Sequence, residues 1–254
     1  MIKYPLNFIS KENLELHVKN TILKYSESLN GMNLWRFNSN IIDPIKMLFD
    51  SFVFNKDLET IIESEIIRQK DKSNNNIIGY FHQNIFQYFT LKDWIVPKTG
   101  FDIVNINKKI FVEMKNKHNT MNSSSAQKTY INMQDVIVKD SKSTCMLVEV
   151  IAKKSQNIPW TISLNNKKIS SENIRRVSID RFYEIVTGDR YAFYKLCNYL
   201  PEVIGKVLKD ISEFKIINEK DTVIEDLKNI TETGLLDSLF KLSFSSYYGW
   251  NNED

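Results

Sequence analysis

Two acidic residues and a lysine lie close together near the middle of the chain. Asp102 stands in one short apolar run, and Glu113 and Lys115 stand in the next. Neighbouring carboxylates repel each other unless a cation lies between them, and Mg²⁺ usually binds one or two carboxylates together with water and phosphate oxygens. The backbone carbonyl of Val112 is a further candidate ligand. With Lys115 to orient or deprotonate a water molecule, this set predicts metal-dependent hydrolysis of a phosphodiester.

A β-hairpin would bring the three side chains together. In residues 110–115, apolar side chains alternate with a second set that includes Glu113 and Lys115, which is the period of a two-faced strand. The polar residues 107–109 form a connection of hairpin length to the preceding apolar run. Because the ends of an antiparallel pair coincide, we expect Asp102 and Glu113 to be neighbours.

An acid followed two residues later by lysine is a common pattern in a chain this rich in both. It also occurs in Glu213-Phe214-Lys215, Asp226-Leu227-Lys228 and Asp140-Ser141-Lys142. These three matches lie in helical or turn-like sequence and read as solvated helix faces or turns. The match at Glu113 differs because it follows a strand pattern, with an acid at hairpin distance before it.

The order of the expected elements predicts an α/β fold in a single domain, residues 1–254. We expect a helical N-terminal part (1–70), a catalytic core (77–165) and a helical C-terminal part (175–254). Within these parts, the patterns predict helices at 57–69, 77–89 and 123–138, a polar loop at 71–76, strands at 94–97, 102–106, 109–117 and 160–164, and a buried central strand at 144–152. Pro201 is expected to open a helix.

Composition fits a core-forming protein of 254 residues with 42% hydrophobic residues, and a net charge of +3 does not by itself indicate a nucleic-acid partner. The N-terminal sequence lacks a signal-peptide pattern, and no apolar run has the length of a membrane span. Two cysteines and three scattered histidines predict neither a disulfide framework nor a zinc site. We therefore expect a cytoplasmic location with no membrane partner.

Two longer stretches resemble known enzymes. Asp102, Glu113 and Lys115 follow the spacing of the PD-(D/E)xK nuclease superfamily, although Phe101 stands where the superfamily's name has proline. The sequence VEMKNKHNTMNSSSAQKTY after GFDIV, and the later RVSIDRFYEIVTGDRYAFYKLCNYLPEVI, resemble type II restriction endonucleases of the SinI-like group, which cut GGNCC sites. The resemblance spans residues 77–204. It implies a mixed central sheet flanked by helices, with additional helices at both ends of the chain.

The resemblance also implies roles and partners. Asp102 and Glu113 match the metal-binding acids, and Lys115 matches the catalytic lysine. Such nucleases often add an acid from an upstream helix, and Glu63 or Glu65 could fill that place, with Glu65 favoured because it lies nearer the edge of the apolar stripe. The implied partners are double-stranded DNA, a second copy in a homodimer that matches a palindromic site, and a companion cytosine DNA methyltransferase acting on the same site.

The polar segment after the second hairpin strand is the candidate DNA-reading segment. Its short polar side chains suit phosphate and base-edge contacts, while the alternative is a loop with Ser123 or Ser124 as a helix cap. Lys128 and Lys153 are candidate phosphate contacts. The candidate DNA contacts within the segment itself are His118, Asn119, Thr120, Asn122, Ser123, Ser124 and Ser125.

Two other functions fit the same residues. One is a repair or recombination nuclease of the same fold that recognises DNA structure instead of sequence. The other is a non-catalytic DNA-binding protein whose acids are surface groups. Cleavage of linear against branched DNA separates the first from a restriction enzyme, and metal binding that depends on Asp102 and Glu113 separates the second.

Overall fold

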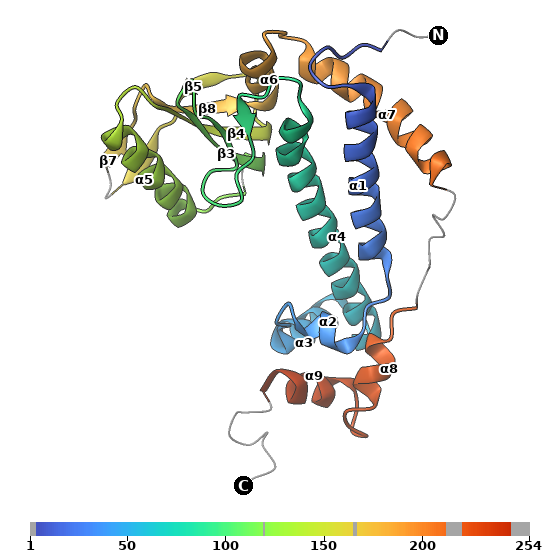
Figure 1. The fold of residues 1–254 in the computed structure, drawn as a ribbon. Helices are drawn as coiled ribbons and strands as arrows, with labels where there is room; N and C mark the ends of the chain where they lie inside the picture. The colour runs from blue at the N-terminus through green and yellow to red at the C-terminus, as the bar shows by residue number, and fades with distance from the viewer. Residues whose placement is uncertain (1–3, 119, 165–166, 212–219, 245–254) are drawn as a thin grey trace. The chain divides into compact units, whose positions relative to one another are not determined.

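The computed structural model describes residues 4–118, 120–164, 167–211 and 220–244 (Figure 1). These residues form two compact units, and each unit combines two separate stretches of the chain. Unit 1 comprises Met1–Ile22 and Ile77–Glu213, and unit 2 comprises Leu23–Asn76 and Phe214–Asp254. The parts expected from the sequence, 1–70, 77–165 and 175–254, are each continuous in the chain, whereas each unit of the structure joins an early stretch to a later one.

Unit 1 contains a six-stranded mixed sheet in the order β1-β2-β3-β4-β8-β5. Strands β3, β4 and β8 are parallel to one another, whereas β1, β2 and β5 join the sheet in antiparallel pairs. A separate two-stranded sheet pairs β6 with β7. The bounds are β1 Trp94–Ile95, β2 Ile103–Asn105, β3 Ile110–Lys117, β4 Thr144–Ile151, β5 Asn157–Pro159, β6 Ile162–Leu164, β7 Lys167–Ile169 and β8 Ile174–Ser178.

The alternating side chains of β3 pack on two different hydrophobic cores. Val112 and Met114 belong to a large core that also includes Phe182 and Tyr183. Phe111 packs against a smaller core around Tyr130 on the opposite face of the sheet. Glu113 and Lys115 alternate with the large-core residues, so they share the face that carries the smaller core.

Helices cover both faces of this sheet. Tyr130 and Met133 of α5 pack in the smaller core, and α6 and α7 contribute to the large core. Figure 1 shows α5 beside the sheet. The helices with residues in unit 1 are α1 Lys11–Leu29, α4 Leu58–Asn84, the 3₁₀ helix η1 Ile85–Tyr88, α5 Ser123–Lys139, α6 Ile179–Thr187 and α7 Ala192–Asp210. The expected mixed sheet flanked by helices is confirmed.

Unit 2 is helical throughout its described residues. Its core joins side chains from the early stretch, such as Phe37 and Ile62, to Leu227 and Leu239 from the late stretch. Asp43 caps the helix Pro44–Phe54 by accepting a hydrogen bond from the amide of Lys46. Besides the last turns of α1 and the larger part of α4, the helices among the described residues of unit 2 are α2 Leu34–Asn38, α3 Pro44–Phe54, α8 Val223–Lys228 and α9 Leu235–Phe244.

The polar loop expected at residues 71–76 is wrong, because these residues lie inside α4, which runs unbroken for 27 residues. The segment DKSNNN contains neither glycine nor proline, so nothing in it stops a helix. Its polar side chains bond back along the helix, as Ser73 Oγ does to the carbonyl of Gln69 at 3.1 Å. Asn75 Nδ2 likewise donates to Asp71 Oδ2 at 2.8 Å.

The expectation that Pro201 opens a helix is also wrong, because Pro201 lies in the interior of α7. Proline lacks the N–H that would bond to the carbonyl four residues earlier, so packing must hold the helix together there. The buried stripe Leu196, Tyr199, Val203 and Val207 runs past the proline on the core side. Tertiary packing therefore overrides the local preference.

Candidate active site

The hairpin places Asp102 beside β3. Ile103 opposes Val112 in the antiparallel pair of β2 and β3, so Asp102, one residue before β2, faces Glu113. Asp102 Oδ2 accepts a hydrogen bond from the amide of Met114 at 2.7 Å. The carboxylate thus takes the place of a backbone partner at the point where β2 begins. The predicted adjacency of the two acids is what this register produces.

Lys115 completes the cluster. Its Nζ lies 2.6 Å from Glu113 Oε1, and the side chains of Lys115 and Glu113 are 30% and 23% exposed. Both side chains are therefore half-buried and reachable from solvent, which a site for an external phosphate requires. The three residues singled out from the sequence converge on one end of the hairpin.

The cluster contains two carboxylates, Asp102 and Glu113, but a single positive group, Lys115. Burial raises the pKa of Asp102, and the charge of Glu113 raises it further, while the Met114 amide and Lys115 oppose the shift. The fold disfavours the negative charge of Asp102, and a cation bound beside it would stabilise that charge. The cluster is therefore a candidate cation site.

The oxygen ligands in the cluster fit a Mg²⁺ ion that the protein binds through few side chains. Asp102 and Glu113 offer hard carboxylate oxygens, and Mg²⁺ typically takes one or two of these and keeps several waters. Within the described ranges, no group of three or more His, Cys, Asp or Glu side chains could hold a metal by itself.

A pocket of about 340 Å³ opens beside Glu113. It lies between the loop before β2 and the second half of α5, and it is lined by Gly100, Phe101, Glu113, Thr129, Asn132, Asp135, Val136 and Lys139. The lining mixes two acids, Glu113 and Asp135, with the amide of Asn132 and the lysine Lys139, which suits water, a hydrated cation or a phosphate oxygen better than an apolar ligand.

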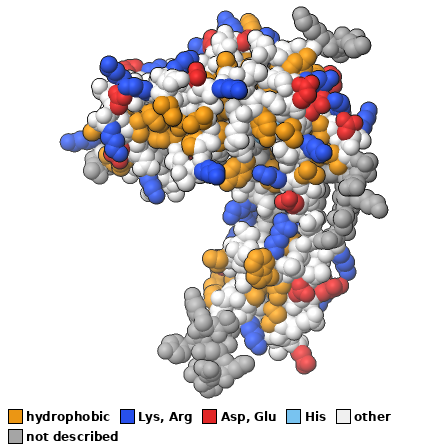
Figure 2. Space-filling model, in the orientation of Figure 1, with side chains coloured by type: hydrophobic (Ala, Val, Ile, Leu, Met, Phe, Trp, Pro, Cys, Tyr) orange, Lys and Arg blue, Asp and Glu red, His pale blue; other side chains and the backbone are white. Residues whose placement is uncertain are grey.

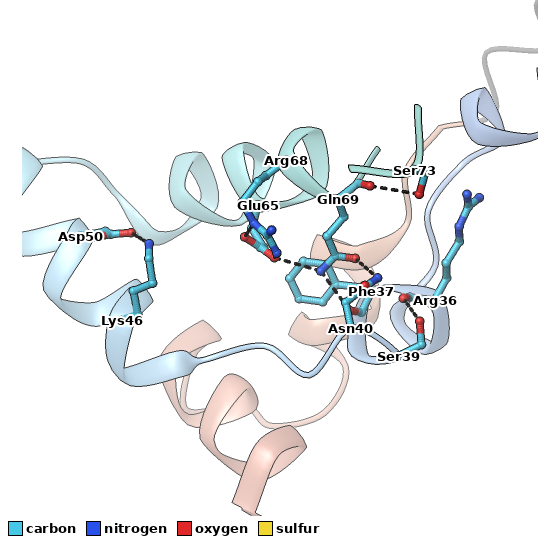
Figure 3. Close-up of polar contacts among 10 residues, drawn as sticks. All are labelled: Arg36, Phe37, Ser39, Asn40, Lys46, Asp50, Glu65, Arg68, Gln69 and Ser73. Carbon is cyan, nitrogen blue, oxygen red and sulfur yellow. Dashed lines mark hydrogen bonds and ion pairs between the residues drawn. The ribbon is translucent and has the colours of Figure 1, made fainter. Parts of the chain in front are cut away.

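Glu65, the expected acid from an upstream helix, lies in unit 2 on α4. Its carboxylate binds Arg68 through two hydrogen bonds of 2.5 Å and accepts a third from Gln69 Nε2 at 3.0 Å (Figure 3). Glu65 thus belongs to unit 2 and Asp102 and Glu113 belong to unit 1, and the place of Glu65 in the metal site stays a prediction. Glu63 is also on the unit 2 part of α4, where it lines a different pocket.

The residue of α4 that reaches the hairpin is Gln83. Its Nε2 lies 3.5 Å from the carbonyl oxygen of Asp102. At this point α4 presents an amide to the backbone of Asp102. Val112 lies inside β3, paired with Ile103 on one side and Met146 on the other, and its role as a carbonyl ligand stays a prediction.

The candidate DNA-reading segment follows directly on β3. The His118 amide donates to the carbonyl of Ile151 at 3.1 Å, and Thr120 Oγ1 donates to the carbonyl of Lys117 at 2.9 Å. Asn119 lies outside the described residues. The remaining candidates are exposed, namely Asn122, Ser123, Ser124, Ser125, Lys128 and Lys153.

The helix cap in this segment is Asn122. Its side chain accepts a hydrogen bond from the amide of Ser125 at 2.8 Å, so the expected capping role of Ser123 or Ser124 is wrong. Both serines instead occupy the first turn of α5, where their hydroxyls are exposed. Figure 2 shows Lys and Arg side chains spread over the visible face among acids, so positive charge for DNA must act locally.

The other acid-x-lysine matches occupy different surroundings. Asp226 in α8 accepts hydrogen bonds from Thr222 and from the amide of Leu34. Asp140 caps the end of α5 and pairs with Lys109. Glu213 to Lys215 lie outside the described residues. The two described matches are structural, as the sequence indicated.

Two charged residues at this end of the sheet were not foreseen. Glu149 on β4 is 1% exposed and pairs with Arg176 on β8. The signal for Glu149 was its position as the single acid in the apolar stretch TCMLVEVI. Arg176 gave no comparable signal, because its strand reads as IRRVS and was not predicted.

Comparison with known proteins agrees with this geometry. Residues 6–209 match the family described as Eco47II restriction endonuclease. The chain is 31% identical over 216 residues to the type II restriction enzyme Eco47II of Escherichia coli, covering 81% of this chain and 89% of that enzyme. It is 28% identical over 204 residues to the type II restriction enzyme Sau96I of Staphylococcus aureus, covering 77% and 78%.

The family match and the two relatives define the class of protein as a nuclease, and the mixed sheet flanked by helices is consistent with it. The chain belongs to the Eco47II restriction endonuclease family, and it is a type II site-specific deoxyribonuclease. The matched range includes the hairpin, Glu149 and Arg176, and it ends before α8. No described helix is both long enough and apolar enough to span a bilayer.

Proposed function

We propose that this restriction endonuclease cuts double-stranded DNA at GGNCC sites in a Mg²⁺-dependent reaction. The observation that carries the proposal is the meeting of Asp102, Glu113 and Lys115 at one end of the β2–β3 hairpin. The GGNCC site is inferred from the resemblance of the segments around Glu113 and Arg176 to SinI-like enzymes.

Asp102 and Glu113 would hold the metal, with the carbonyl of Val112 as a further ligand. When bound, Mg²⁺ supplies electrostatic stabilisation of the phosphoryl group and lowers the pKa of bound water. The Met114 amide fixes Asp102 through Oδ2, which leaves Oδ1 for the cation. Glu113 contributes its oxygens from the rigid centre of β3, so both acids are held before the metal arrives.

Lys115 is the candidate group for the attacking water. Its ammonium now binds Glu113 and would turn toward water and phosphate once a cation neutralises that carboxylate. As an ammonium it would orient the water and offset the negative charge that develops on the phosphate, whereas only its neutral amine form could deprotonate the water. Its half-buried position strengthens these interactions relative to bulk water.

The partners follow from the same hypothesis. A homodimer would place two such sites on the two strands of a palindromic duplex. The residues from His118 to Ser125, with Lys128 and Lys153, would contact the DNA on the surface that continues from β3. A companion cytosine methyltransferase would protect the host's own copies of the site, and both enzymes would act in the cytoplasm.

The direct test is digestion of plasmid DNA with Mg²⁺, followed by sequencing of the ends. Cleavage confined to GGNCC is the expected result. Cleavage confined to another sequence would contradict the specificity alone. Random nicking, or the same cleavage in the presence of a chelator, would contradict the proposed mechanism.

A further inference from the structure

The candidate site continues across the sheet beyond the hairpin. Lys115 on β3 is in register with Glu149 on β4, and Glu113 is in register with Leu147, which is in turn paired with Arg176 on β8. Residues paired across adjacent strands point to the same face of a sheet. Glu149 and Arg176 therefore share the face of Glu113 and Lys115, at the same end of the parallel strands.

Glu149 fixes the orientation of Arg176. The acid is 1% exposed, and its Oε1 accepts hydrogen bonds from both Nε and Nη2 of Arg176, the former at 3.0 Å. A buried carboxylate is stable only when paired, so the guanidinium is held in place by the cost of separating the two charges. The other oxygen, Oε2, is buried and has no partner among the described residues.

Arg176 also reaches the surface at the candidate DNA-reading segment. Its side chain is 29% exposed, and Nη2 donates to the carbonyl of His118 at 3.2 Å. Within the described ranges, Nη1 forms no hydrogen bond to the protein. A guanidinium with a fixed plane and free N–H groups suits a phosphate, which it binds through paired hydrogen bonds.

We propose that Arg176 contacts a DNA backbone phosphate and that Glu149 is the positioning residue that holds it there. The guanidinium reaches from β8 to the carbonyl of His118, directly after β3, so the phosphate it binds would lie beside the candidate DNA-reading segment. This inference rests on the proposed function, because it takes the hairpin site as the place where DNA is cut.

A purely structural pair that ties β8 to the segment after β3 is the alternative. Arg175 offers a matched control, because it precedes Arg176 on the same strand but points to the other face. It bonds Asn157 Oδ1 at 3.0 Å and Glu172 Oε2 at 2.8 Å, and its side chain is 21% exposed. Removing either arginine changes the net charge by the same amount.

The experiment measures the dissociation constant of the full chain for a short GGNCC duplex at several NaCl concentrations without divalent metal. Loss of one phosphate contact reduces the slope of log Kd against log salt by about one. We expect this reduction for Arg176→Gln, and an unchanged slope for Arg176→Lys and Arg175→Gln. Equal slopes for Arg176→Gln and the wild type, or equal reductions in both glutamine variants, would overturn the proposal.

Glu149→Gln tests the positioning role. It leaves the charge of Arg176 but releases its orientation, so we expect a wild-type salt slope with a KM for cleavage raised several-fold and kcat little changed. An unchanged KM would show that Glu149 does not position the guanidinium for DNA.

A measurement on the wild type covers variants that fail to fold. Arginine modification by a dicarbonyl reagent, read by mass spectrometry, should be blocked by the duplex at Arg176 and not at Arg175. Equal reactivity of Arg176 with and without DNA would overturn the proposal. Wild-type protein that cuts no DNA would refute the proposed function, whereas a wild type that cuts while Arg176 stays unprotected would refute only this inference.

Discussion

Lys115 can be replaced without disturbing the hydrophobic cores, so its role in catalysis can be tested apart from its role in stability. Its ammonium touches the side chain of Glu113 at the surface end of β3, so its loss leaves the hydrophobic cores intact. A positioned acid–base group contributes about 10²- to 10⁴-fold to a rate. We expect Lys115→Ala to lower kcat by that order while leaving the affinity for DNA within a few-fold.

The measurement is single-turnover cleavage together with a binding titration. Lys108→Ala is the control, since Lys108 is exposed in the hairpin turn at the other end of the strands. Full activity of Lys115→Ala would remove this lysine from the mechanism.

Asp102 is held where its charge is disfavoured, and this has a consequence for stability. A raised folded-state pKa means that the folded chain is stabilised by protonation, and that this contribution is lost as pH rises through the folded pKa. Asp102→Asn keeps an acceptor for the Met114 amide without the charge. At pH 8 and without metal, we therefore expect the variant to have a higher Tm than the wild type, with the difference shrinking on acidification.

Mg²⁺ should reverse this order, because only the wild type gains stability from a bound cation. Thermal unfolding with and without Mg²⁺ is the measurement. Asp140→Asn is the matched control, since the Lys109 ammonium lowers the pKa of Asp140 and its loss should lower Tm or leave it unchanged. A Tm of Asp102→Asn that rises with Mg²⁺ as much as that of the wild type would exclude Asp102 as a ligand.

The pH profile of cleavage depends on the same carboxylate. A proton on Asp102 competes with the cation, and burial makes that proton harder to remove than from an ordinary aspartate. The acid side of the rate profile should therefore move to lower pH as the Mg²⁺ concentration rises. A profile that does not shift between low and high Mg²⁺ would contradict this competition.

Among the elements, α5 links stability to the candidate DNA-reading segment through its cap. Asn122 accepts the amide of Ser125, and replacing such a cap by alanine costs about 0.5–2 kcal/mol of stability. We expect Asn122→Ala to lower the free energy of unfolding by that amount, and Asn122→Ser to recover most of it. Chemical denaturation measures both.

The same pair of variants separates capping from DNA contact. If Asn122 also touches DNA, Asn122→Ser will retain stability but bind the duplex more weakly than the wild type. Equal binding by Asn122→Ser and the wild type would assign Asn122 to the helix alone.

Elements with one strong local pattern could be predicted from the sequence. The alternation around Glu113 predicted the face of β3 and its bounds to within a residue, and the apolar stretch around Leu147 predicted β4 equally closely. Elements held by distant packing could not. β8 contains Arg175 and Arg176, which hide a strand pattern because their partners lie on β4 and β5. α4 passes through a polar segment because helix formation there is favoured by its own side-chain bonds.

Only those residues of the candidate site that lie close together in the sequence could be predicted. Asp102 lies on one side of a hairpin whose strands are joined by residues 106–109, and Glu113 and Lys115 lie on the other, so hairpin geometry alone brings them together. Glu149 and Arg176 reach the same end of the sheet through crossover connections, whose register is set by packing and not by spacing. Gln83 joins them from a helix whose length was not foreseen.

At the scale of the whole molecule, the proposed homodimer predicts a stoichiometry. Unit 2 exposes large apolar side chains on α3, with Phe52 79% and Val53 72% exposed, and Figure 2 shows hydrophobic side chains at the surface of both units. Sedimentation velocity with a single-site GGNCC duplex should give two chains per duplex. One chain per duplex at saturation would contradict a dimer acting on both strands.

The interleaving of the two units has a consequence for how the protein is made. A nascent chain presents Phe37 and Ile62 early, but Leu227 and Leu239, which complete their burial, leave the ribosome only after the entire nuclease sheet has been synthesised. Domains generally fold as units during synthesis, and apolar surface that stays exposed until later segments are made is prone to aggregation. Unit 1 can therefore assemble during translation, whereas unit 2 is completed last, and a message cut short after α7 would yield a chain with a sheet but an uncovered second core.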